Sequence, residues 1–239
     1  MNPLILSFLA SISTIIGLLF IKFKNTKNIL CFAFSFASGV MIMVSIFDLL
    51  PESFIKLNMY FNVFPSIIIL LIFFSLGIII SMLIDKYIPS NDQIYRVGVI
   101  SMIAIIIHNI PEGIATFIAG SIDIKLGINL SLSIALHNIP EGIIIALPIY
   151  YSTKSKSRAI IYTTVAGLSE FIGSLFSFLF LKDVVNNLFI GLMLSIIAGI
   201  MIQISFYELI PNALKIKSRG IVGYFILGVT VMLLSIILI

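Results

Sequence analysis

The chain has 239 residues, of which 60% are hydrophobic and only 10% are charged. A soluble domain averages about 25% charged residues, so this composition excludes an ordinary soluble protein and indicates a membrane protein. The net charge of +4 does not indicate a nucleic-acid partner, because the basic residues lie between hydrophobic runs. The single cysteine, Cys31, excludes an internal disulfide and a cysteine-cluster metal site.

Eight apolar stretches are long enough to cross a bilayer as helices, which requires about 20 residues each. In chain order they are residues 4–21, 30–50, 64–84, 96–119, 127–150, 159–181, 188–210 and 220–239. No positive charge precedes the first stretch, and its apolar run is long, which predicts a retained helix instead of a signal peptide. The longest connection, residues 51–63, is too short for a folded domain. We therefore predict an all-α integral membrane protein with one transmembrane domain, residues 1–239.

The basic residues predict the orientation in the membrane. The connections after the first, third, fifth and seventh stretches carry eleven of the fourteen: Lys22, Lys24, Lys27, Lys86, Arg96, Lys154, Lys156, Arg158, Lys215, Lys217 and Arg219. The alternate connections carry one each, namely Lys56, Lys125 and Lys182. Short cytoplasmic connections are enriched in lysine and arginine. We therefore expect both termini outside the cytoplasm, in a bacterial inner (plasma) membrane.

Residues 38–51 of the second stretch align without gaps with residues 198–211 of the seventh. The matched positions include Gly39 with Gly199, Met41 with Met201, Ser45 with Ser205, Pro51 with Pro211, and the acid Asp48 with the acid Glu208. These stretches cross the membrane in opposite directions, which is typical of an inverted-topology repeat with its substrate site between the halves. The prediction is a 3+2+3 arrangement, in which stretches one to three mirror six to eight around the central pair.

The hexapeptide His-Asn-Ile-Pro-Glu-Gly occurs twice, at residues 108–113 and 137–142, and contains both histidines of the chain. Each copy lies near the middle of its stretch, on neighbouring antiparallel helices. Residues four apart share one face of a helix. His108 therefore points the same way as Glu112, and His137 the same way as Glu141. Imidazole nitrogen and carboxylate oxygen together suit zinc and neighbouring divalent metals.

Three further side chains extend this set. Asn109 and Asn138 precede the glutamates by three residues, and their amide oxygens with the carboxylates suggest a second, harder position. Glu170 lies near the middle of the sixth stretch. An ionised acid at the bilayer centre costs at least ~2.5–3.5 kcal/mol, and no lysine or arginine lies mid-stretch to compensate it. A structural role for these buried groups is the alternative, but a bound divalent cation supplies the missing counter-charge.

Other acids and methionines are candidates for the metal pathway. Asp48 and Glu52 lie at the outer end of the second stretch, and Glu208 lies at the inner end of the seventh. Charges reach the membrane interface easily at such positions, so structural and pathway roles are both open. Met41 and Met201 offer soft contacts to a passing metal, although packing is the commoner role of methionines at helical spacing.

The paired hexapeptides, the Ser-Glu-x-x-Gly sequence around Glu170 and the eight crossings resemble the ZIP family of metal transporters, most closely its short bacterial members. The resemblance implies uptake of zinc, often with iron, manganese, cobalt or cadmium, into the cytoplasm. It also implies two metal positions: one at His108, Glu112, His137 and Glu141, and one at Asn109, Glu112, Asn138, Glu141 and Glu170. Stretches one, four, five and six are expected to slide against the others in an elevator-like movement.

Two departures from the family pattern are visible. Related bacterial members commonly have proline directly after the glutamate of the sixth stretch, where this chain has Phe171. This difference bears on the local kink and not on the ligand itself. Many members also carry a long histidine-rich loop between the third and fourth stretches. Here residues 85–95 are short and contain no histidine, so we expect no metal-sensing loop.

Two rival functions remain open from the residues alone. An intramembrane zinc hydrolase needs three protein ligands, an open coordination position and a general base, and the usual His-Glu-x-x-His arrangement is missing. An ion channel could also select its ion by rings of charge. The favoured prediction is a transporter, not an enzyme, with divalent metal ions as substrates and no cofactor. Its surroundings are the lipid bilayer, and a homodimer is compatible with the sequence.

Overall fold

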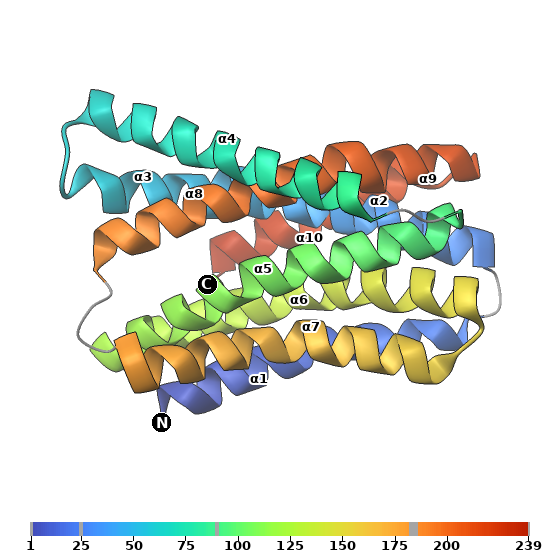
Figure 1. Cartoon of the computed structure of the whole chain (residues 1–239), viewed down its shortest axis with the longest axis horizontal. Coiled ribbons are helices and arrows are strands. Elements are labelled where there is room, and N and C mark those ends of the chain that lie inside the picture. The colour runs from blue at the N-terminus through green and yellow to red at the C-terminus, as the bar shows by residue number, and fades with distance from the viewer. Residues whose placement is uncertain (1, 24–25, 89–90, 182–185, 239) are drawn as a thin grey trace.

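The computed structural model describes residues 2–23, 26–88, 91–181 and 186–238, and over these ranges it is a bundle of helices without strands (Figure 1). Lys24 and Lys182, which form part of the predicted charge asymmetry, lie outside the described residues. In chain order the helices are α1 (Pro3–Ile16), α2 (Thr26–Val44), α3 (Leu50–Asn58), α4 (Val63–Tyr87), α5 (Gln93–Ile122), α6 (Ile124–Thr153), α7 (Lys156–Phe176), α8 (Asn187–Ile204), α9 (Ile210–Ile216) and α10 (Ile221–Leu238).

The prediction of an all-α membrane protein is confirmed. Within the described ranges, seven helical stretches are long and apolar enough to cross a bilayer: Pro3–Lys22, Lys27–Asn58, Val63–Tyr87, Gln93–Ile122, Ile124–Thr153, Lys156–Phe180 and Asn187–Ile216. The eighth predicted stretch forms the shorter apolar helix α10. The predicted ends of the second and seventh stretches, at residues 50 and 210, are wrong, because both helices continue beyond them.

Both stretches continue through a proline, Pro51 or Pro211. Proline lacks an N–H group, and its ring clashes with the carbonyl four residues earlier, so a proline inside an α-helix normally disrupts it. Each is instead preceded by a wider π-helical turn, Ser45–Leu49 and Ser205–Leu209. The prolines then fall in the first turns of α3 and α9, where a missing N–H is tolerated.

Side-chain caps set the short connections between α5, α6 and α7. Asp92 accepts hydrogen bonds from the backbone N–H groups of Ile94 and Tyr95 and begins α5. Asp123 accepts one from the N–H of Lys125 and is the single residue between the end of α5 and the start of α6. Such caps satisfy helix N–H groups that have no partner within the helix. The two hexapeptides are thereby carried on directly consecutive, antiparallel helices.

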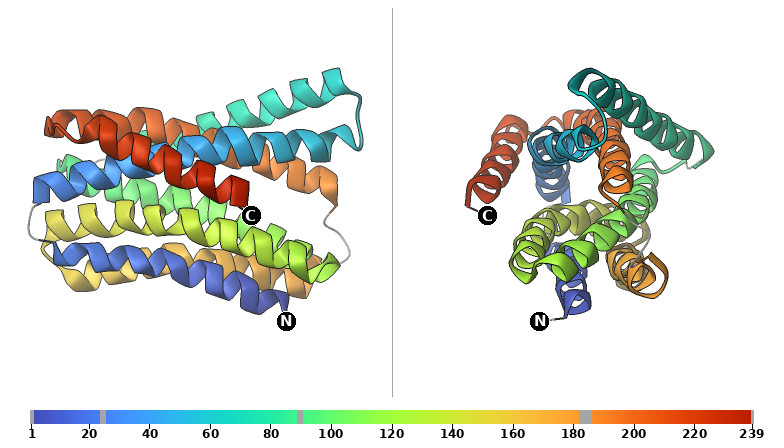
Figure 2. Two further views of the ribbon diagram at one scale, coloured as in Figure 1. Left: turned by 180° about the vertical axis from the view of Figure 1, so that it is seen from behind. Right: turned by 90° about the vertical axis from the view of Figure 1, so that its left-hand side faces the viewer.

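The helices form two groups (Figure 2). In the first, α5 packs on α6 and α7, and α1 packs on the same α6 and α7. In the second, α4 and α3 pack on α8, and α2 packs on α9 and α10. The groups meet chiefly where α2 packs on α6 and α5 packs on α8. Both hexapeptides and Glu170 therefore lie on helices of the first group.

Glycine pairs bring helices into backbone contact within each group. A Cβ atom added to any of these glycines would overlap the backbone of the neighbouring helix, which only glycine avoids. The crossings are α5–α7 with Gly113 and Gly173, α1–α6 with Gly142 and with Gly17 directly after α1, α4–α8 with Gly77 and Gly199, and α2–α10 with Gly39 and Gly228. All four of these crossings lie inside one group or the other, so each group is closely packed by itself.

We predict that Gly199→Ala destabilises the protein, because the new methyl group would overlap the carbonyl oxygen of Phe74. Overpacking of this kind costs about 1–3 kcal/mol, and it should appear as a lower thermal unfolding midpoint in detergent. Gly223→Ala is the matched control, since nothing lies within 4 Å of a Cβ at that position. Equal midpoints for the two variants would contradict the packing account.

Candidate metal-binding site

The structure buries every one of the seven predicted ligands. His108, Asn109 and Glu112 lie on α5, His137, Asn138 and Glu141 on α6, and Glu170 on α7, and none is more than 3% exposed. Both hexapeptides are helical throughout, and α5 and α6 run unbroken past Pro111 and Pro140. The helical spacing used to group the side chains therefore holds.

Histidine and glutamate pair across the two helices. Nε2 of His108 lies 3.0 Å from Oε1 of Glu141, and Nε2 of His137 lies 3.4 Å from Oε2 of Glu112. Each histidine thus contacts the glutamate of the other hexapeptide. The sequence predicted that each histidine shares a face with the glutamate of its own hexapeptide, and the structure adds that these two faces meet.

The asparagines connect this pair of helices to α1 and α7. Nδ2 of Asn138 donates a hydrogen bond of 2.7 Å to Oε2 of Glu170 and one of 3.2 Å to the backbone carbonyl of Ala10. Nδ2 of Asn109 donates to the carbonyl of Ala166, also at 3.2 Å. Glu170 is therefore brought to the hexapeptide of α6, as its predicted role requires.

Each of the seven side chains also has one buried polar atom without a hydrogen-bond partner: Nδ1 of both histidines, Oδ1 of both asparagines, Oε1 of Glu112 and Glu170, and Oε2 of Glu141. An unpaired buried polar atom costs about 1–3 kcal/mol. Imidazole nitrogen and carboxylate or amide oxygen are also the donor atoms that divalent metals take in proteins. The chemistry of this set therefore fits a cation better than it fits a purely structural network.

The present geometry is not that of a closed metal site. Among the described residues, no three histidine, cysteine, aspartate or glutamate side chains are arranged around one point as metal ligands. Nε2 of each histidine instead faces a carboxylate oxygen. Metal binding therefore requires these side chains to turn from each other toward a shared ion.

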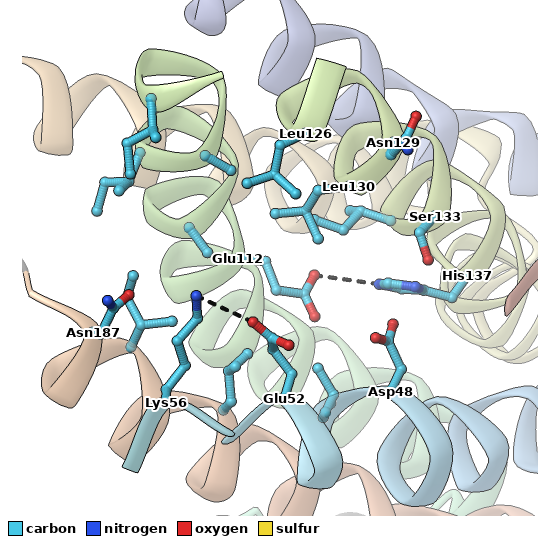
Figure 3. A pocket seen from close by; sticks show the side chains of 18 of the residues that line it. Asp48, Glu52, Lys56, Glu112, Leu126, Asn129, Leu130, Ser133, His137 and Asn187 are labelled. Atoms are coloured by element: carbon cyan, nitrogen blue, oxygen red, sulfur yellow. Dashed lines mark hydrogen bonds and ion pairs between the residues drawn. The ribbon is translucent and has the colours of Figure 1, made fainter. Parts of the chain in front are cut away.

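A cavity of about 310 Å³ leads to the site from one end of the bundle (Figure 3). It lies between the two helix groups and is lined mainly by apolar side chains of α5, α6 and α8. Its polar lining includes Glu112 and His137, with the carboxylate of Asp48 directed toward them. Glu52 also lines it and forms an ion pair with Lys56 at 3.2 Å. The predicted outer acids are thus next to an open approach to the site.

Glu208 has a different environment from Asp48, its counterpart in the repeat. Its Oε1 lies 3.3 Å from Nη1 of Arg96, whose Nη2 is ion-paired with the carboxylate of Asp85. Arg96 also donates to the carbonyls of Asp85 and Ile88. This arginine of α5 thereby connects the first helix group to the second, a contact that sequence reasoning missed.

Sequence reasoning also missed the contribution of α1. Residues 10–17 of the first helix align without gaps with residues 166–173 around Glu170, with identical Ala, Ser, Ile and Gly at four positions. Thr14 takes the place of Glu170, and its carbonyl lies against Gly142 as that of Glu170 lies against Gly113. This additional repeat was the sequence signal that could have shown that α1 packs against a hexapeptide helix as α7 does. Met41 and Met201, in contrast, are fully buried in the apolar core, which favours packing.

Comparisons with known proteins agree with these observations. The family model described as "ZIP Zinc transporter" matches residues 89–237. The zinc transporter ZupT of Clostridium perfringens is 34% identical over 269 aligned residues, covering 98% of this chain and 94% of the relative. ZupT of Streptococcus mutans is 36% identical over 98% of this chain and 96% of its own length, and ZupT of Escherichia coli is 34% identical over 99% and 96%. Similarity along nearly the whole chain, together with the buried hexapeptide pair, shows that this protein belongs to the ZIP family.

Proposed function

We propose that this protein carries divalent metal ions, zinc foremost, across the plasma membrane into the cytoplasm. The observation that carries the proposal is the set of seven buried ligand-type side chains, each with an unpartnered polar atom, two of which line a largely apolar cavity that also contains Asp48 and Glu52. The relatives named above are zinc transporters. Iron, manganese, cobalt and cadmium are the further candidate substrates. The whole chain acts as one transporter domain, not as an enzyme.

The proposed site takes two ions. The first would be bound by His108, His137, Glu112 and Glu141, and the second by Asn109, Asn138, Glu170 and the same Glu112 and Glu141. Each shared glutamate has one oxygen on a histidine and a second oxygen without a partner. One carboxylate could therefore serve two ions through its two oxygens. The cations would also supply the charge that three buried carboxylates otherwise lack.

Two features support the proposed 3+2+3 inverted repeat. The π-helical turns at Ser45–Leu49 and Ser205–Leu209 occupy matching places in residues 38–51 and 198–211. The glycine crossings also correspond. In the repeat, stretch one matches six, two matches seven, three matches eight and four matches five. This exchange turns the α2–α10 crossing into α8–α4 and the α1–α6 crossing into α7–α5. A symmetric fold of this kind is common where a transporter opens to each side in turn.

The same geometry supports alternating access by movement of α1, α5, α6 and α7 against the other helices. Glycine contacts hold each group together, whereas ion pairs of Arg96 connect the two groups away from the cavity. The charge asymmetry would place the Arg96 end in the cytoplasm and both termini outside. The structure would then be an outward-open form, in which the carboxylate of Asp48 attracts cations to the cavity.

We predict that Glu112→Gln lowers zinc uptake into proteoliposomes by at least about tenfold, since it removes a charged ligand shared by both ions. Glu52→Gln is the control, because its side chain is 45% exposed and paired with Lys56 near the cavity mouth. Wild-type uptake should saturate with zinc concentration. Uptake by Glu112→Gln equal to that of the control would refute the ligand assignment, and non-saturating conductance would indicate a channel.

We predict that Arg96→Gln favours the inward-open form, because the arginine connects the two groups only at the closed end. Cysteine labelling in a Cys31→Ser background reports this shift. Ser133→Cys lines the cavity and should label more slowly from outside. Ala104→Cys is buried one turn from His108 toward Arg96 and should label faster from the cytoplasmic side. The expected change in labelling rate is up to about fivefold, because loss of a partly exposed ion pair shifts the equilibrium between the two forms by about that factor.

Arg158→Gln is the matched control for this experiment, since it neutralises an exposed arginine at the same end of the same helix group. The labelling rates at both reporter positions in Arg158→Gln should equal those of the protein in which Arg96 and Arg158 are intact. If Arg96→Gln behaved like this control, the arginine would not hold the two groups together. Labelling of Ser133→Cys only after permeabilisation would overturn the proposed orientation.

A further inference from the structure

The amides of Asn109 and Asn138 are each fixed by a backbone carbonyl on a helix that carries neither hexapeptide. Asn138 donates to the carbonyl of Ala10 on α1, and Asn109 donates to that of Ala166 on α7, both at 3.2 Å. Both asparagines and both alanines are fully buried. Solvent therefore offers these amides no alternative partner.

The surroundings of the two carbonyls are the same. Oγ of Ser13 donates to the carbonyl of Ala10, and Oγ of Ser169 donates to that of Ala166; both hydrogen bonds are 2.6 Å long. The arrangement of alanine carbonyl, serine three residues later and asparagine from the facing helix thus occurs twice. It follows the gap-free match between residues 10–17 and 166–173. Its recurrence on two separate helix pairs argues against a chance contact.

The carbonyl contact determines which end of the amide faces inward. A carbonyl oxygen can only accept a hydrogen bond, so the asparagine must turn its NH₂ group toward it. Oδ1 then points away from the carbonyl, and in both residues this oxygen is buried without a partner. An asparagine without such a contact could present NH₂ instead, which cannot bind a cation.

We propose that the carbonyls of Ala10 and Ala166 are positioning groups that hold Asn138 and Asn109 as oxygen ligands for a divalent cation. The inference rests on the proposed function and extends the metal-binding unit from the hexapeptide helices to α1 and α7. It also gives a physical reason for an amide, in place of a carboxylate, at both positions. Aspartate offers the same ligand oxygen and more charge, but its carboxylate cannot donate to the carbonyl.

Asn109 provides the clearer test, because Asn138 also contacts Glu170. Asn109→Asp keeps an oxygen toward the ion and loses the donor, whereas Asn109→Leu loses both. Zinc affinity of the purified full-length protein is measured by calorimetry, and the visible absorption of bound cobalt reports the ligand geometry. We expect Asn109→Asp to lose about tenfold in affinity, as Asn109→Leu does, and to change the cobalt spectrum.

A zinc affinity of Asn109→Asp that is unchanged or increased would overturn the inference. If added charge alone mattered, Asn109→Asp would bind zinc as tightly as the wild type or more tightly. Asn212→Asp is the control, because the amide of Asn212 also donates to a helix carbonyl, that of Glu208 at 2.7 Å, but lies away from the hexapeptides. The zinc affinity of this variant should equal that of the wild type. Wild-type affinity in Asn109→Leu would exclude Asn109 as a ligand and leave the proposed function standing, whereas failure of the wild type to bind zinc would refute the proposed function itself.

Discussion

The structure depends on one constraint, the burial of three carboxylates and two imidazoles within membrane-crossing helices that carry no lysine or arginine at the same depth. Charge in a bilayer is tolerated only with a partner. Here the partners come from across helix interfaces, as histidine to glutamate between α5 and α6, and as asparagine to glutamate between α6 and α7. The helices must therefore stay in close register for these groups to be buried at all.

Backbone packing supplies that register. Gly113 brings α5 against the carbonyl of Glu170, and Gly142 brings α6 against the carbonyl of Thr14. The last residue of each hexapeptide thus sets the distance to the helix that fixes its asparagine. Polar side chains and a glycine within six residues thus form one structural unit, in which the glycine allows the neighbouring helix to come close enough to contact the asparagine.

The sequence predicted the parts of this protein that depend on local pattern. Long apolar runs predicted the helices, and a four-residue spacing predicted that His108 and Glu112 share a face. The continuation past Pro51 and Pro211 was not predictable from proline chemistry, because a π-helical turn has no side-chain signature of its own. The pairing of Arg96 with Glu208 joins residues far apart in the chain. Asn138 contacts the backbone carbonyl of Ala10, so the residue type at position 10 gives no sign of this contact. The match between residues 10–17 and 166–173 does give a sign of it.

The central claim is that the hexapeptide histidines and glutamates bind the transported ion directly. Zinc K-edge X-ray absorption of the purified, zinc-loaded protein tests it most directly, because imidazole rings give a characteristic multiple-scattering pattern and sulfur ligands lie near 2.3 Å, beyond the roughly 2.0–2.2 Å of nitrogen and oxygen. The account predicts nitrogen and oxygen ligands with imidazole scattering that disappears in the His108→Ala, His137→Ala double variant. A sulfur shell, or a spectrum that the double variant leaves unchanged, would contradict it.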